Sequence, residues 1–283
     1  MKRIIVIIGC LLAAISGAAQ SKVITDSLQS QVLQCHQKYN VYLPDGYDPA
    51  LVYPVVYLLH GLYGCYSDWV ERADIKAVAD LLTASGEICE MVIIMPNAGD
   101  SDVHHYQNGY FNVQGWSYED FFFQEFMPEV ERKYNCGGKK ELRSIMGLSM
   151  GGGGSVVYCQ RHPELFSSCY AMSPWLDNKH RDARGTDIPG SKLTITDNSV
   201  HKYSALDFMD RADDATVDRL KTVKWFLDCG DDDSLMPQSV NLHLIMRAAG
   251  IPCELRVRDG AHTWEYWHTA LYTALPFASR SFR

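Results

Sequence analysis

The chain has 283 residues, of which 47% are hydrophobic, and a formal net charge of −8 at pH 7. This length and apolar content suit one α/β domain with a large buried core. The acidic balance argues against nucleic acid or an anionic membrane surface as a partner.

Residues 1–19 resemble an export signal. Two cations precede the apolar residues 4–15, and small residues lead to a cut near Ala19. The apolar run is too short to favour a membrane span. Lipoprotein processing at Cys10 is an alternative, but the apolar stretch before it is only about six residues, short of the roughly 7–15 expected. The sequence therefore predicts an exported chain, periplasmic or extracellular, whose mature part is 20–283.

Strands and helices are expected to alternate through the mature chain. In chain order they are two antiparallel strands within 22–44, a strand over 53–59, a helix over 75–85, a strand over 91–95, a helix over 121–134 with Ser117 as a candidate N-cap, strands over 168–172 and 223–227, a helix over 241–249, a strand over 254–258, and a helix from about Trp264. This alternation predicts a mainly parallel sheet covered by helices on both faces. Residues 173–216 interrupt the pattern and are expected to form a lid-like or cap-like insertion above the site.

The most informative motif is the run G-L-S-M-G at 147–151. This G-x-S-x-G pattern is typical of a nucleophile elbow, in which Ser149 occupies a sharp, strained turn between a strand and a helix. The helix that starts near Met150 is expected to direct free N–H groups at the reacting centre. The alternative is a glycine-rich loop without a catalytic role, which the glycines at 151–154 would also explain.

An acid and a histidine follow the serine. Hydrolases with a nucleophile elbow use this chain order of serine, aspartate or glutamate, and histidine. The strand over 223–227 runs into Asp231, Asp232 and Asp233, and His262 lies in a loop after the last strand. Alone, a triple aspartate suits a solvated turn, and a loop histidine suits the surface. The three features in this order favour a Ser–acid–His site, and they leave open which aspartate is the acid.

The loop His60-Gly61-Leu62-Tyr63-Gly64 is expected to complete the site. In such hydrolases one oxyanion donor is the N–H of the residue after the nucleophile, here Met150. The other lies in the loop after an early strand, here assigned to Leu62. His60 is expected to be a hydrogen-bonded packing residue rather than a second base.

Eight cysteines lie beyond the signal, at positions 35, 65, 89, 136, 159, 169, 229 and 253. An even number in an exported chain permits disulfides. Cys169 and Cys229, which lie in apolar strand patterns, favour buried free thiols instead. No C-x-x-C or Cys/His metal spacing is present, so no zinc site is expected.

The motifs resemble those of the esterase D-like family of α/β-hydrolases, which takes in feruloyl and acetylxylan esterases, S-formylglutathione hydrolases, tributyrin-type esterases and mycolyltransferases. The matching stretches are Y-L-L-H-G-L-Y-G at 57–64, M-V-I-I-M-P-N-A-G at 91–99, Y-E-D-F-F at 118–122, G-L-S-M-G-G at 147–152, D-C-G-D-D-D at 228–233 and D-G-A-H-T-W at 259–264. The resemblance implies an α/β-hydrolase fold, Ser149 as nucleophile and His262 as base. The family pattern G-x-x-D implies Asp233 as the acid. Relatives often carry Phe-Leu after that acid, where this chain has Ser234-Leu235, so Asp231 and Asp232 stay open as alternatives for the acid.

The expected function is that of an exported serine carboxylesterase. It would hydrolyse feruloyl, acetyl or short-chain acyl esters, on plant-polysaccharide-derived or small substrates, without a metal or an organic cofactor. Tyr63 and Trp264 are the expected substrate-binding residues. A wider aromatic set for the cleft comprises Trp69, His104, His105, Tyr106, Trp116, Trp175 and Trp267. Core packing of Trp264 and Trp267, which lie three apart in a helix, is the alternative.

Three other functions stay open from the sequence. They are an acyltransferase of the mycolyltransferase type, an S-formylglutathione hydrolase-like thioesterase, and a binding module that keeps the fold without catalysis. The sequence leaves the acyl and alcohol specificity and the oligomeric state undetermined.

Overall fold

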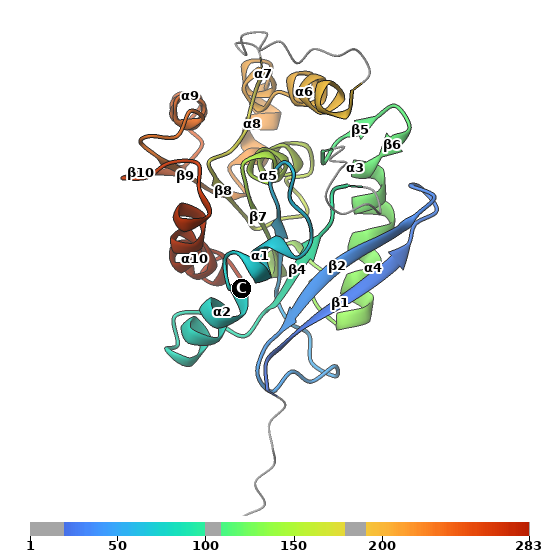
Figure 1. Cartoon of the computed structure of the whole chain (residues 1–283). Coiled ribbons are helices and arrows are strands. Elements are labelled where there is room, and N and C mark those ends of the chain that lie inside the picture. Colours follow the sequence, from blue (N-terminus) through green and yellow to red (C-terminus); the bar gives the residue numbers. More distant parts are fainter. Residues whose placement is uncertain (1–19, 100–108, 179–190, 283) are drawn as a thin grey trace, which may run out of the picture.

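The computed structural model describes residues 20–99, 109–178 and 191–282. Its main feature is one eight-stranded sheet, in the order β1-β2-β4-β3-β7-β8-β9-β10 (Figure 1). The strands are β1 (Lys22–Gln29), β2 (His36–Leu43), β3 (Val55–Leu59), β4 (Val92–Pro96), β7 (Arg143–Leu148), β8 (Ser168–Met172), β9 (Lys224–Gly230) and β10 (Cys253–Arg258). The first two strands pair antiparallel, and the six from β4 to β10 pair parallel. The predicted mainly parallel sheet is therefore confirmed.

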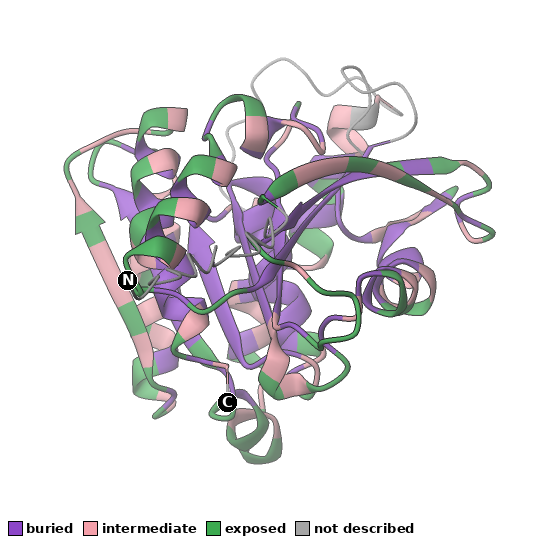
Figure 2. Cartoon of the chain, turned by 90° about the horizontal axis from the view of Figure 1, so that it is seen from below, coloured by how far each residue is buried: buried purple, intermediate pink, exposed green. Residues whose placement is uncertain are grey.

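Alternation along the central strands gives the sheet two apolar faces. In β3, Val55, Tyr57 and Leu59 join one buried cluster, whereas Val56 and Leu58 join the other. All five residues of β3 are buried, as expected for a parallel strand covered on both sides. The edge strand β1 alternates between partly buried and exposed residues, and Figure 2 shows the buried residues concentrated in the centre of the molecule.

Helices cover both faces, as the alternating pattern predicts. One face carries α1 (Asp68–Glu71), α2 (Ile75–Ala84) and α10 (Trp264–Ser279), and the other carries α3 (Tyr118–Phe121), a π-helical turn (Phe122–Phe126), α4 (Met127–Tyr134), α5 (Met150–Arg161) and α9 (Met236–Ala248). This layered arrangement is that of the α/β-hydrolase fold, and it leaves the carboxyl ends of the parallel strands free to carry a site.

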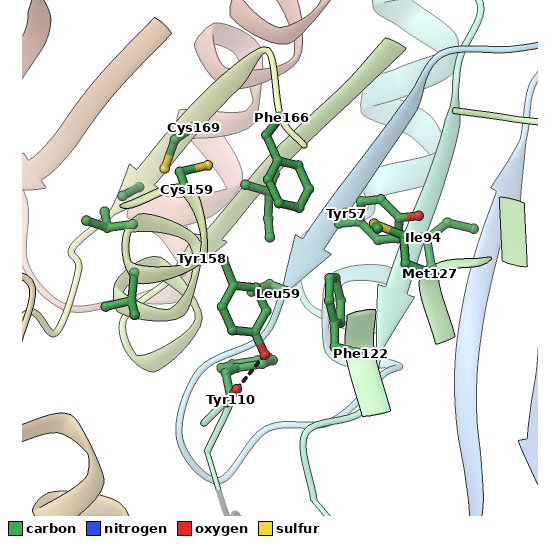
Figure 3. Close-up of a cluster of buried hydrophobic side chains, with 14 of the residues drawn as sticks. Tyr57, Leu59, Ile94, Tyr110, Phe122, Met127, Tyr158, Cys159, Phe166 and Cys169 are labelled. Atoms are coloured by element: carbon green, nitrogen blue, oxygen red, sulfur yellow. Dashed lines mark hydrogen bonds between the residues drawn. The ribbon is translucent and has the colours of Figure 1, made fainter. Parts of the chain in front are cut away.

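Figure 3 shows how aromatic packing holds α5 against the sheet. The ring of Tyr57 on β3 lies 5.4 Å from that of Phe122, which in turn lies 5.1 Å from that of Tyr158 on α5. The Tyr158 hydroxyl donates a hydrogen bond to the carbonyl of Tyr110. Because α5 starts directly after Ser149, this packing also fixes the position of the elbow.

One predicted helix cap and one predicted helix start differ from the structure. The helix after Ser117 begins there, but the Ser117 side chain makes no capping hydrogen bond. The Asn112 side chain instead accepts the Asp120 N–H at 3.1 Å, because the short hairpin of β5 (Asn112–Val113) and β6 (Trp116–Ser117) brings it over the helix end. Helix α9 begins at Met236 rather than near 241, with a proline in its first turn, where a missing N–H costs nothing.

The described part of 173–216 is largely helical. It includes α6 (Lys192–Lys202), α7 (Ala205–Asp210) and the start of α8 (Asp214–Leu220). Helix α7 packs against α5 and α9, and Ala205 and Met209 contribute to the core of that face. No described residue of 173–216 lines the cavity that holds Ser149, so the lid role stays a prediction.

The predicted export signal and Cys10 lie outside the described residues. The eight cysteines of the described chain are all free thiols, and Cys169 and Cys229 are buried. Among the helices described, none combines the length and the apolar character that a membrane crossing requires.

Candidate active site

Ser149 lies between β7 and α5 in a backbone conformation that side chains rarely adopt, with φ +52° and ψ −117°. Such strain costs of order 1–3 kcal/mol and persists only where the surroundings impose it. Gly151 shows why the turn needs a residue without a side chain. A Cβ there would lie 2.5 Å from the His60 carbonyl oxygen and 2.6 Å from that of Leu59. The elbow is therefore pressed against the end of β3, as the G-x-S-x-G pattern requires.

The three groups that the sequence singled out lie in hydrogen-bond contact. The Ser149 Oγ is 2.9 Å from His262 Nε2, and His262 Nδ1 is 2.7 Å from Asp233 Oδ2. Ser149 is 8% exposed and the Asp233 side chain is fully buried, whereas the His262 side chain is 36% exposed. A buried acid, a half-exposed imidazole and a hydroxyl at the end of a cavity form an array that can move a proton.

The three consecutive aspartates have different surroundings. The Asp231 carboxylate accepts the Gly260 N–H at 3.0 Å, and Asp232 is exposed. Only Asp233 has a carboxylate in contact with His262, and its other oxygen accepts the Leu235 N–H at 2.9 Å. Burial opposes ionisation of Asp233, but these hydrogen bonds outweigh burial and lower the pKa of Asp233 below its ordinary value.

The loop that carries His262 is fixed by the first turn of α10. The Tyr266 hydroxyl donates to the buried Asp228 carboxylate at 2.6 Å, and Trp267 Nε1 donates to the Ser173 hydroxyl at 3.1 Å. The Trp267 ring meets the imidazole of His262 edge to face, with centroids 4.8 Å apart. These contacts limit rotation of the imidazole, which keeps it aimed at Ser149.

The loop after β3 lies beside the elbow. Leu62 lines the same cavity as Ser149, and Met150 is the first residue of α5, so its N–H has no partner within the helix. Asp68 orders the loop by accepting the Cys65 N–H at 3.1 Å. Both candidate oxyanion donors, the N–H groups of Leu62 and Met150, thus belong to segments that border the serine.

His60 is buried and held by two backbone groups. Its Nε2 accepts the Ala98 N–H at 2.9 Å, so Nδ1 carries the proton and donates to the Gly61 carbonyl at 2.8 Å. Burial lowers the pKa of His60, which keeps the ring neutral. A neutral ring with both nitrogens occupied suits the packing role expected from the sequence.

A cavity of about 470 Å³ opens above the serine. Its lining residues are Gly61, Leu62, Tyr63, Gly64, Asp68, Arg72, Leu148, Ser149, His262, Trp264 and Trp267. Tyr63 is 66% exposed and held at a positive φ of 62°. Within the described chain, no group of three or more His, Cys, Asp or Glu residues is arranged to hold a metal ion.

The aromatic set expected for the cleft is only partly there. Tyr63, Trp264 and Trp267 line the cavity. Trp69 and Trp116 are buried elsewhere, and Trp69 packs edge to face against Trp264 at 5.4 Å. Trp175 does not line the cavity, and the aromatic residues at 104–106 lie outside the described residues. No sequence motif singles out Arg72, which follows Asp68 by one helical turn and lines the same cavity.

Comparisons with known proteins identify the family. A protein-family model described as "Putative esterase" matches residues 30–278. A solved ferulic acid esterase is 45% identical, with a TM-score of 0.87 over 93% of this chain and 100% of that chain.

Two curated relatives are more distant. An endo-1,4-beta-xylanase/feruloyl esterase of Xylanibacter ruminicola is 26% identical over 242 residues, which are 83% of this chain and 28% of the relative. This chain therefore spans less than a third of the length of that relative. An acetyl esterase of Caldicellulosiruptor saccharolyticus is 24% identical over 238 residues, which are 80% of this chain and 83% of the relative. Because the family match covers most of the chain, the resemblance inferred from the motifs is confirmed, and the chain belongs to this esterase family of the α/β-hydrolase fold.

Proposed function

We propose that the chain is a serine carboxylesterase in which Ser149 is the nucleophile, His262 the general base and Asp233 the acid that orients the imidazole. The proposal rests above all on the pair of hydrogen bonds, 2.9 Å and 2.7 Å long, that joins the three side chains at the end of a cavity. A Ser–His–acid array with this order of contacts is the arrangement that acyl transfer needs.

The reaction follows from these contacts. Ser149 Oγ attacks the ester carbonyl carbon while its proton passes to His262 Nε2, and the N–H groups of Leu62 and Met150 bind the oxyanion. The intermediate collapses, the alcohol leaves with the proton from Nε2, and an acyl-Ser149 ester remains. Water then attacks the acyl carbon, gives its proton to Nε2, and the carboxylic acid departs as Ser149 regains its proton. Asp233 holds the imidazole with its proton on Nδ1 throughout and stabilises the charged ring.

Feruloyl, acetyl or short-chain acyl esters are the proposed substrates, on plant-polysaccharide-derived or small alcohols. Support comes from the names of the relatives, which include feruloyl and acetyl esterases. The exposed ring of Tyr63 and the indole of Trp264 on the cavity wall suit contact with an aromatic acyl group or a sugar ring. Export through residues 1–19 fits a polymeric substrate outside the cell and would be tested by sequencing the N-terminus of the mature protein.

The direct test is the variant Ser149→Ala with p-nitrophenyl acetate, p-nitrophenyl butyrate and methyl ferulate. Removal of the nucleophile is expected to lower kcat by roughly four to six orders of magnitude. Ser155→Ala is the matched control, because Ser155 lies on α5, the helix that follows Ser149, and its hydroxyl donates to the Gly151 carbonyl. A Ser149→Ala protein that is folded by circular dichroism and hydrolyses all three esters at the wild-type rate would refute the proposal.

A further inference from the structure

Arg72 places a positive charge at the cavity that holds Ser149. It directly follows α1 and lines the cavity together with Asp68, Tyr63 and Trp264. Its side chain is 59% exposed, so solvent and ligands can reach the guanidinium. The chain as a whole carries a net charge of −8, and a cation at this position therefore changes locally how an anionic ligand is received.

The guanidinium of Arg72 makes two contacts, with Trp264 and with Asp68, and neither of them is a hydrogen bond. Its central carbon lies 5.7 Å from the centroid of the Trp264 ring, within the range of a cation–π contact. Its Nε lies 3.9 Å from Asp68 Oδ1, which is an ion-pair distance but too long for a hydrogen bond. No acceptor among the described residues takes a hydrogen bond from the Arg72 side chain. Its planar set of N–H groups is thus held in place and left available.

A carboxylate is a group that such a guanidinium binds well, because two parallel N–H donors match its two oxygens. We propose that Arg72 binds a carboxylate carried by the ester substrate, on either its acyl or its alcohol part. The site would then favour a dicarboxylic acid half-ester, or an ester of a uronic acid sugar, over a neutral ester of the same size. This inference rests on the proposed esterase function and adds a charge preference to it.

The size of the preference is limited by solvent and by Asp68. The exposed position weakens the ion pair, and Asp68 at 3.9 Å offsets part of the charge. Asp68 also accepts the Cys65 N–H, however, and this hydrogen bond offsets part of the negative charge that faces Arg72. We expect Arg72 to raise the selectivity for the charged ester roughly five- to tenfold, as for an exposed charge-assisted hydrogen bond.

The test compares two esters that differ only at the end of the acyl chain. p-Nitrophenyl hydrogen succinate ends in a carboxylate where p-nitrophenyl butyrate ends in a methyl group. The measured quantity is the ratio of their kcat/KM values, which Arg72→Gln should lower about five- to tenfold and Arg72→Lys should lower less. A second arm compares an acetylated methyl glucuronoside with the acetylated methyl glucoside, and it tells an alcohol-side carboxylate from an acyl-side one.

Arg132→Gln is the matched control. Arg132 is also an exposed, salt-bridged arginine, but it pairs with Glu129 on α4 and does not line the cavity. Its loss should leave both ratios unchanged. Wild-type ratios in Arg72→Gln on both arms, or an equal drop in Arg132→Gln, would overturn the proposal.

Two further readouts separate the possible failures. If Arg72→Gln does not fold, about 0.5 M NaCl should lower the wild-type succinate-to-butyrate ratio by screening the pair, and a salt-independent ratio would overturn the proposal. A wild-type protein that cleaves butyrate while Arg72→Gln keeps both ratios refutes only the role of Arg72. A wild-type protein that cleaves none of the esters refutes the esterase function itself.

Discussion

Replacement of Asp233 by asparagine tests which of the three consecutive aspartates is the catalytic acid. Asp233 uses one oxygen to accept the Leu235 N–H at 2.9 Å and the other to accept His262 Nδ1–H at 2.7 Å. In Asp233→Asn the Leu235 N–H needs an acceptor, so the amide oxygen takes that side. The amide NH₂ then faces His262 Nδ1.

This geometry imposes the wrong tautomer on the imidazole. An NH₂ group at Nδ1 requires that nitrogen to act as an acceptor, so the ring proton moves to Nε2. Nε2 can then no longer accept the proton of Ser149, from which it lies 2.9 Å. Loss of the base and of the charge that stabilises the imidazolium should lower kcat roughly a thousand- to ten-thousand-fold, or about 4–5.5 kcal/mol of transition-state stabilisation.

The assay is the steady-state hydrolysis of p-nitrophenyl butyrate by Asp233→Asn, Asp231→Asn and Asp232→Asn side by side. The amide that Asp231→Asn introduces can still accept the Gly260 N–H through its oxygen, and Asp232 is exposed, so both controls should stay within about threefold of the wild type. The KM should change little in Asp233→Asn, because the carboxylate does not line the cavity. A folded Asp233→Asn that keeps more than about a tenth of the activity, or a loss in Asp231→Asn as large as in Asp233→Asn, would refute the assignment of the acid.

Two further predictions concern stability. Glu131→Gln should lower the free energy of unfolding by about 3 kcal/mol, measured by urea titration. The reason is that it leaves the nearly buried Arg143 without the carboxylate that it contacts at 2.6 and 2.8 Å. A change under about 1 kcal/mol would contradict this prediction. Burial opposes ionisation of Asp26, but hydrogen bonds from Lys133 and Tyr134 lower its pKa from 3.8 to about 2. Its charge therefore stabilises the fold above about pH 4, and this contribution is lost as the pH falls through about 2. Asp26→Asn should cost about 1 kcal/mol at pH 7 after solvent screening, and the difference from the wild type should vanish toward pH 2; a difference independent of pH would exclude this origin.

The fold was predictable because its strands follow simple patterns. The runs at 53–59 and 91–95 are continuous apolar stretches, and such runs suit parallel strands that are buried on both faces. Boundaries that depend on a single distant contact were not predictable. The cap of the helix after Ser117 comes from Asn112. Its position is set by the hairpin of β5 and β6, whose strands have two residues each and leave no clear signal in the sequence.

The candidate site was predictable to the level of segments. The chain order of elbow, acid turn and histidine loop placed the three groups at the ends of β7, β9 and β10, which the parallel sheet brings to one edge. Side-chain exposure was not predictable from residue type. Trp69 belonged to the wider aromatic set expected for the cleft, but it donates its N–H to the Leu59 carbonyl and is fully buried, whereas Trp264, an expected substrate-binding residue, lines the cavity.

The contact between Asp233 and His262 is set by the backbone of two loops rather than by the two side chains alone. The backbone hydrogen bonds between β9 and β10 continue into the loops that follow the two strands. The Asp231 N–H donates to the Arg258 carbonyl at 3.1 Å, and the Asp232 N–H donates to the Gly260 carbonyl at 3.0 Å. The loops approach so closely that a Cβ on Gly230 would lie 2.1 Å from the Gly260 carbonyl oxygen. A shift of the acid by one position would turn its side chain away from His262, since neighbouring residues of this turn point in different directions. The run of three aspartates is therefore not three interchangeable carboxylates, because the paired loops leave only one of them facing the imidazole.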